Sequence, residues 1–160
     1  MFGYYTGDMT LSISDRIGHH LKRVDQELIA AKSAVLNPHG LTVPQYTVLL
    51  ALFQEPGLSG AALARRCLVT PQTMSTVIAT LEGKGLVDRQ NHPVHTHVQE
   101  VRLSRKGRTV LAKADEAAVE VERALSGRFT AEESALLLEF LGRCSDALGE
   151  VRRPSRGPAR

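Results

Sequence analysis

The 160-residue sequence predicts a mainly α-helical chain with one small β-hairpin, and three observations lead to this prediction. Apolar residues recur every three or four positions over most of the chain, which is the period of a helix that buries one face. Residues that cap helices precede several of these stretches. Aromatic residues make up 4% of the chain and Trp is absent, so the core consists of small aliphatic side chains that suit packed helices.

The first predicted helix covers residues 10–36, where apolar residues from Ile13 to Val35 keep a helical spacing. The segment Asn37–Gly40 contains proline and glycine and ends it. A second helix is expected over Thr42–Gln54. Its start is marked by Thr42 and Gln45, which have the spacing of a capping box.

A third, short helix, capped by Ser59, is expected from Ser59 to Cys67, followed by a turn at Leu68–Val69. Thr70 then caps a fourth helix whose first residue is proline, the position where proline is preferred. Gly85 is expected to end this helix in a left-handed conformation. The apolar stripe of the fourth helix consists of Met74, Val77, Ile78 and Leu81.

Two extended segments, Leu86–Gln90 and Val98–Ser104, are joined by a polar tip at 91–97 and predict a β-hairpin. A long helix is expected over residues 105–126. Thr130 and Glu133 form a second capping box in front of the last helix. The predicted order is therefore four helices, two strands and two helices.

The net charge of +3 is unevenly distributed along the chain. Residues 59–110 hold eight Lys and Arg against three Asp and Glu, whereas residues 111–150 hold four against nine. The tail 152–160 holds four Arg and no acid, and we expect it to be disordered. Such an asymmetry predicts that the middle of the chain faces a polyanion.

A short helix, a tight turn, a capped helix and a hairpin, in this order, form a winged helix-turn-helix, which is a DNA-binding arrangement. The polar face of the fourth helix has small side chains that donate and accept hydrogen bonds, with no acid before Glu82. Such a face suits base edges in the major groove. The predicted base-reading residues are Gln72, Thr73, Ser75, Thr76 and Thr80.

Four basic residues near this helix are predicted to contact the DNA backbone, and the alternative interpretation is that they are ordinary surface charges. They are Arg65, Arg89, Arg105 and Lys106. We find no nucleotide-binding fingerprint and no nucleophile motif in a suitable context, so neither a cofactor nor an enzymatic activity is predicted.

The middle segment contains a series of motifs, which are Leu41–Tyr46, Glu55–Ser59, Leu63–Ala64, Val69–Met74, Leu81–Val87 and Arg102–Arg108. In order and spacing they resemble the MarR family of transcription regulators, and the match covers about residues 10–150 and is strongest over 41–108. The resemblance implies a homodimer whose first and last helices interlock, and two winged lobes that bind a pseudo-palindromic operator. Members usually repress transcription, and many release DNA when a small, often phenolic, ligand binds.

We therefore predict a single domain in which 10–36 and 111–150 are dimerisation helices and 41–110 is the DNA-binding lobe. The apolar stripes of the terminal helices are too exposed for one small lobe to cover, which also favours a second copy. No apolar run approaches the roughly 20 residues of a membrane span, and we find no charged start followed by an apolar run of the kind that marks a signal peptide, so we expect a cytoplasmic protein.

The resemblance also places a ligand site near His19, His20 and Tyr46. The alternative interpretation is two exposed histidines and a tyrosine that packs in the core. The cysteines, Cys67 and Cys144, are too few for a disulfide framework and are interpreted as structural. The alternative is an oxidant sensor at Cys67, since adjacent arginines would lower the pKa of its thiol.

The wing tip departs from the family, because His95 and His97 stand where its members usually carry an Asp-x-Arg pair. Together with His92 they are also a candidate zinc site, although no fourth ligand is nearby. Two alternative functions follow. The first alternative to a DNA-binding regulator is a winged-helix module that binds a protein instead of DNA. The second is a metal-responsive regulator.

Because histidine is mostly neutral near pH 7.5 whereas arginine is always charged, we predict a wing contact with DNA that is weak or sensitive to pH. DNA affinity should be higher at pH 6 than at pH 8, since protonated imidazoles attract phosphate. The measurement compares the two pH values for the wild type and for His97→Ala. An unchanged affinity in the variant would rule out the wing contact.

Overall fold

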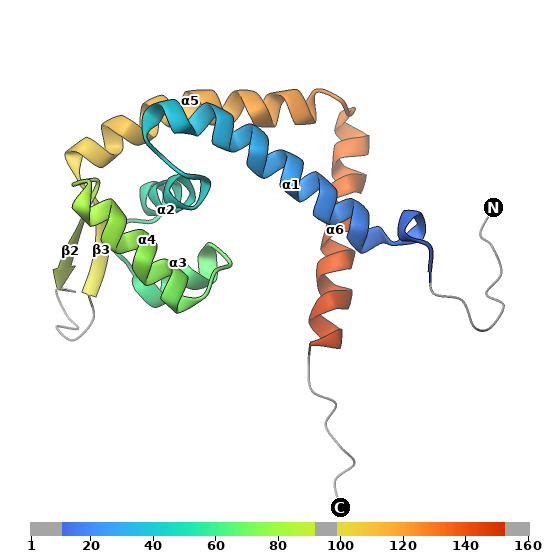
Figure 1. Cartoon of the computed structure of the whole chain (residues 1–160), viewed down its shortest axis with the longest axis horizontal. Helices are drawn as coiled ribbons and strands as arrows, with labels where there is room; N and C mark the ends of the chain where they lie inside the picture. The colour runs from blue at the N-terminus through green and yellow to red at the C-terminus, as the bar shows by residue number, and fades with distance from the viewer. Residues whose placement is uncertain (1–10, 92–98, 153–160) are drawn as a thin grey trace, which may run out of the picture. The chain divides into compact units, whose positions relative to one another are not determined.

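The computed structural model describes residues 11–91 and 99–152 of the chain. The described residues up to Ala118 form one compact unit, and those from Val119 onward form a second. Helix α5 begins in the first unit and ends in the second (Figure 1). The helices are α1 (Ile17–Leu36), α2 (Val43–Gln54), α3 (Gly60–Arg66), α4 (Pro71–Gly83), α5 (Arg105–Ser126) and α6 (Ala131–Val151), and the strands are β1 (Leu58–Ser59), β2 (Val87–Asn91) and β3 (Gln99–Leu103).

The starts of α2, α3, α4 and α6 lie where the capping residues predict them. Thr42 Oγ1 accepts the Gln45 amide at 3.4 Å, and Gln45 Oε1 accepts the Thr42 amide at 3.3 Å. Thr130 and Glu133 make the same reciprocal pair at the start of α6. Both pairs satisfy amides that a helix start leaves without a partner.

The predicted start of the first helix is wrong. A 3-10 helix covers Ile13–Asp15, the backbone at Arg16 is extended, and α1 starts at Ile17 instead of residue 10. Residues 11–20 are all exposed, so no packing continues the helix across this point. Instead the Arg16 guanidinium donates to the Leu11 carbonyl at 2.9 Å.

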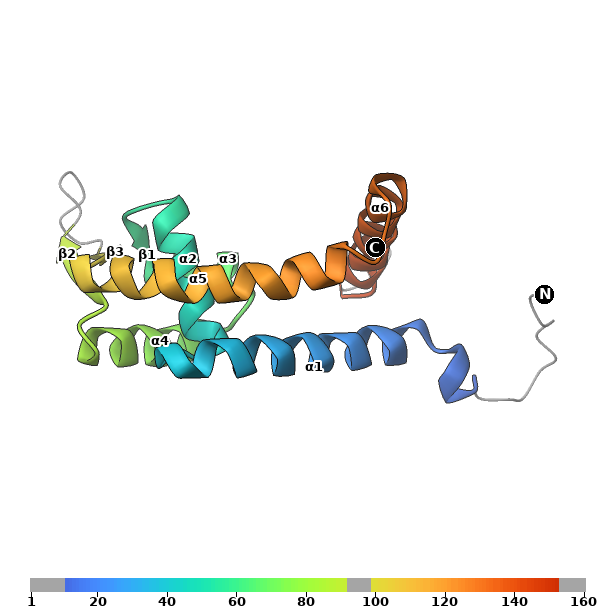
Figure 2. The same ribbon diagram turned by 90° about the horizontal axis from the view of Figure 1, so that it is seen from above.

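The hairpin is confirmed, with β2 pairing antiparallel to β3 from Val87–Leu103 to Asn91–Gln99. Sequence reasoning missed β1, which pairs with the other edge of β3 through Leu58–Val101 and Ser59–Glu100. The sheet order is therefore β1-β3-β2. Figures 1 and 2 show this small sheet in the first unit, next to α4.

One aliphatic core fills the first unit and receives residues from α1 to α5 and from the sheet. Met74, Ile78 and Leu81 of α4 are at most 3% exposed, so the predicted stripe is confirmed, with Val77 partly buried beside it. On β3, Val101 and Leu103 are buried, but the neighbouring Glu100 is buried as well, so the strand does not alternate strictly. None of the described helices has the length and hydropathy of a membrane span.

The start of α5 packs closely against the segment that follows α4. A β-carbon on Gly107 would lie 2.0 Å from the carbonyl oxygen of Leu86, which is far inside contact distance. Ser104 closes the junction, because its hydroxyl donates to the Gly85 carbonyl at 2.7 Å and accepts the Gly107 amide at 2.9 Å. Only glycine allows this approach.

We predict that Gly107→Ala lowers the free energy of unfolding by about 1–3 kcal/mol, because the methyl group must push the backbone of Leu86 away. Gly18→Ala is the matched control, since nothing lies within 4 Å of its β-carbon position and alanine favours a helix. Urea denaturation at one protein concentration measures both. Equal effects of the two substitutions would contradict the close contact.

Candidate nucleic-acid interface

Helix α4 presents its polar face to solvent because of how it begins and what it buries. Thr70 Oγ1 accepts the Thr73 amide at 3.1 Å, and Pro71 is the first helical residue. The buried stripe then fixes the rotation of the helix. The residues on the opposite side, Gln72, Thr73, Ser75, Thr76 and Thr80, are all exposed.

Two of the hydroxyl groups of this face have a defined polarity. The Thr76 hydroxyl donates to the Gln72 carbonyl at 3.2 Å, and the Thr80 hydroxyl donates to the Thr76 carbonyl at 2.9 Å. Their protons are thus used within the helix, and their oxygens are left to accept. An acceptor in the major groove matches the amino group of adenine or of cytosine.

The acidic residue at the end of this helix is paired. Arg89 of β2 donates through Nε to Glu82 Oε2 at 2.8 Å. The pair moderates the negative charge beside the polar face, and it engages one of the five N–H donors of the guanidinium. Sequence reasoning placed Arg89 at the wing base but did not predict its partner.

The other residues predicted to contact the DNA backbone lie at two places in the fold. Arg65 is exposed on the last turn of α3, and Arg105 is exposed at the start of α5. Lys106 donates to the Lys84 carbonyl at 2.7 Å, so it also ties α5 to the end of α4. Lys84, which sequence reasoning missed, donates to the carbonyl of Gly40 at 2.8 Å.

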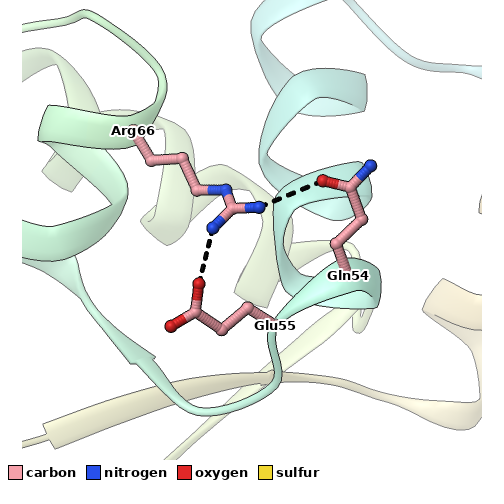
Figure 3. A network of polar contacts seen from close by, with 3 residues as sticks. All are labelled: Gln54, Glu55 and Arg66. Atoms are coloured by element: carbon pink, nitrogen blue, oxygen red, sulfur yellow. Dashed lines mark hydrogen bonds and ion pairs between the residues drawn. The ribbon is translucent and has the colours of Figure 1, made fainter.

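Arg66, the last residue of α3, is paired with residues at the end of α2. Its guanidinium donates to Glu55 Oε2 at 2.5 Å and to Gln54 Oε1 at 3.1 Å, so it ties α3 to the end of α2 (Figure 3). These partners lie 11 and 12 positions earlier in the chain, beyond the reach of local sequence patterns. We therefore assign Arg66 to the scaffold of the helix-turn-helix.

The residues proposed for a ligand site do not share one environment. His19 and His20 are exposed near the start of α1, whereas Tyr46 is 7% exposed and its hydroxyl donates to Asp115 Oδ1 at 2.7 Å. Asp115 lines a cavity of about 350 Å³ between α2 and α5. Its other lining residues are Leu50, Phe53, Gln54, Arg108, Leu111 and Ala112.

The two cysteines are both half-buried thiols. Burial raises the pKa of the Cys67 thiol, and the positive charge of Arg66 offsets only part of this. The thiol is therefore protonated at neutral pH, which supports the structural interpretation of Cys67.

The histidines of the wing tip, His92, His95 and His97, lie outside the described residues. The wing contact and the zinc site at this tip therefore stay predictions. Within residues 11–91 and 99–152, no three His, Cys, Asp or Glu side chains are grouped closely enough to hold a metal ion.

The short helix α3, its turn, the capped helix α4 and the three-stranded sheet define a winged helix-turn-helix protein. Comparison with known proteins gives the family. The model of the MarR family matches residues 39–96. The HTH-type transcriptional repressor Rv2887 of Mycobacterium tuberculosis is 36% identical over 137 residues, which are 84% of this chain and 99% of that protein.

Solved structures agree with this result. The Rv2887 protein in complex with p-aminosalicylic acid is 34% identical, has a TM-score of 0.63 and covers 81% of this chain and 98% of its own. The repressor CouR bound to a 23-mer DNA duplex is 26% identical, has a TM-score of 0.75 and covers 86% and 99%. The chain belongs to the MarR family of transcription regulators.

We predict that Glu82→Gln strengthens binding to duplex DNA, because it removes a negative charge and releases Arg89 toward phosphate. The slope of log affinity against log salt should steepen by about 0.9 for each additional phosphate that the protein neutralises. Glu120→Gln is the control, since this glutamate of α5 also pairs with an arginine, Arg123. Equal slopes for both variants and the wild type would show that breaking the pair with Glu82 gives Arg89 no additional phosphate contact.

Proposed function

We propose that this protein is a homodimeric, sequence-specific repressor that releases its DNA operator when a small aromatic acid binds. The observation that carries the proposal is the exposed face of α4. It presents amide and hydroxyl groups, without a carboxylate before Glu82, on a helix held rigidly by a cap and a buried stripe. This is the chemistry of a helix that reads bases in the major groove.

In this proposal Gln72, Thr73, Ser75, Thr76 and Thr80 contact base edges. Arg65, Arg89, Arg105 and Lys106 then contact phosphates, which positions α4 without adding sequence preference. Support comes from the MarR relatives, since CouR has been solved on a DNA duplex and Rv2887 in complex with DNA.

The second copy in the proposed dimer covers the terminal helices. Helix α6 has no buried residue, and its Leu138 and Leu148 are 70% and 60% exposed. On α1, Ile17 and Val24 are 67% and 47% exposed, and only Leu36 is buried. Apolar surface of this extent favours association, and two copies related by a twofold axis match two operator half-sites about 34 Å apart.

The cavity between α2 and α5 is our proposed effector site. Its volume of about 350 Å³ lies within the range of small-molecule sites. Arg108 and Asp115 are seven residues apart on α5, which is about 10 Å along the helix axis. An aromatic ring placed between them would direct a carboxylate to Arg108 and a hydroxyl or amino donor to Asp115, against the apolar side chains of Phe53 and Leu111.

The solved relatives support this ligand class, because Rv2887 has been solved with salicylic acid and with p-aminosalicylic acid. Sequence reasoning named Tyr46 for the site. In this proposal Tyr46 acts through its hydrogen bond to Asp115 and orients that carboxylate, whereas His19 and His20 take no part.

The proposed function predicts selective capture of one DNA site. Fragments of the source genome are incubated with the protein at physiological salt and the bound ones are sequenced. We expect one enriched pseudo-palindrome, bound by two copies with an affinity that falls steeply with salt. Uniform weak binding would contradict specific regulation, and no binding at all would favour the protein-interaction alternative.

The proposed effector site predicts that Arg108→Gln raises the concentration of 4-hydroxybenzoic acid needed for DNA release by about tenfold or more, the worth of a lost charge-assisted hydrogen bond. Lys113→Gln is the control, since Lys113 is an exposed cation of α5 outside the cavity lining. Release is measured by fluorescence anisotropy of labelled operator. Equal sensitivity of both variants would place the effector elsewhere.

A further inference from the structure

Three helix ends in the first unit share one backbone motif. A residue with positive φ follows the helix, and the amide of the next residue donates a hydrogen bond to the carbonyl five positions before it. The positive-φ residues are Gly40 at +70°, Leu68 at +56° and Gly85 at +67°. This arrangement closes a helix by satisfying its last carbonyl groups. The closing bonds are Leu41 N to Leu36 O at 3.3 Å, Val69 N to Ala64 O at 3.0 Å and Leu86 N to Leu81 O at 2.9 Å.

Glycine occupies two of these positions and leucine the third. Among the described residues, Leu68 is the only residue other than glycine with positive φ. The conformation brings a β-carbon close to a carbonyl oxygen, which is why glycine is usual there. A leucine at this point therefore works against the stability of the turn.

The side chain of Leu68 does not stabilise the fold by packing. It is 92% exposed, the highest value among the large hydrophobic side chains exposed in the described residues. Its neighbour Val69 packs against the core instead. Neither packing nor backbone geometry accounts for a leucine here, so its side chain is available for a contact outside the chain.

The position of Leu68 indicates the partner. It lies two residues before Thr70, the cap of α4, and so borders the start of the polar face at Gln72. On its other side, its amide bonds to the carbonyl of the exposed Arg65. The apolar group that duplex DNA presents in the major groove is the C5-methyl group of thymine.

We propose that Leu68 is a specificity-determining residue that contacts the C5-methyl group of a thymine in each operator half-site. This inference rests on the proposed function, since it requires α4 to lie in the major groove. It adds an apolar contact from the turn to the polar reading by the helix.

The experiment combines protein variants with a scan of the operator in which each thymine is replaced in turn by uracil, which lacks only the methyl group. The wild type should lose affinity about fourfold at one symmetric position, the effect of losing one buried methyl group. Leu68→Ala removes the contact from both half-sites, so it should bind the natural operator about sixteenfold more weakly, twice the free-energy loss of one methyl group, and be insensitive to uracil at that position. Leu68→Met should behave as the wild type.

Leu68→Gly separates this contact from a folding defect. It removes the side chain and also relieves the backbone, so its melting temperature should stay level or rise by up to about 4 °C while operator affinity falls as in Leu68→Ala. A weaker affinity together with a lower melting temperature would overturn this expectation and assign Leu68 to the fold.

The outcomes distinguish this inference from the function on which it rests. If the wild type binds its operator and Leu68→Ala binds equally well, the leucine contact is wrong and the proposed function stands. If Leu68→Ala binds weakly but no uracil position depends on Leu68, the specificity role is wrong. If the wild type selects no site in the genome, both proposals fall.

Discussion

The hydrophobic packing of one side of α4 is the interaction on which the arrangement of the DNA-binding lobe depends. Met74, Ile78 and Leu81 lie in the core, and each contributes about 1.5–3 kcal/mol by leaving water. A rotation of α4 about its axis would expose them, so the direction of its polar face is set by hydrophobic packing. The hydroxyl groups of Thr76 and Thr80 need no contact of their own to face outward.

Both ends of α4 are also held by hydrogen bonds. Thr70 caps the start, and at the other end the carbonyl of Lys84 accepts a hydrogen bond from Lys106 of α5. The same α5 lines the proposed effector cavity through Arg108 and Asp115. A ligand that shifts α5 relative to α2 would therefore move the contact that holds the end of α4, which is a short physical route from effector to DNA.

The basic middle segment offers less free charge than its composition suggests. Arg66 pairs with Glu55, Arg89 with Glu82 and Arg102 with Glu100. Lys84 and Lys106 bond to backbone carbonyl groups. Much of the positive charge counted in residues 59–110 thus holds the scaffold together, and Arg65 and Arg105 are among the cations left exposed at its surface.

The sequence by itself determined those features whose causes lie within a few residues. The caps at Thr42, Ser59, Thr70 and Thr130, the left-handed Gly85 and the apolar stripe of α4 depend on local geometry, and all are confirmed. Only the tertiary structure decided what depends on distant partners. Strand β1 exists because Leu58 meets Val101, and Tyr46 is fixed by Asp115, 69 positions away. No local pattern contains these pairs, because the partners are far apart in the sequence and meet only in the folded chain.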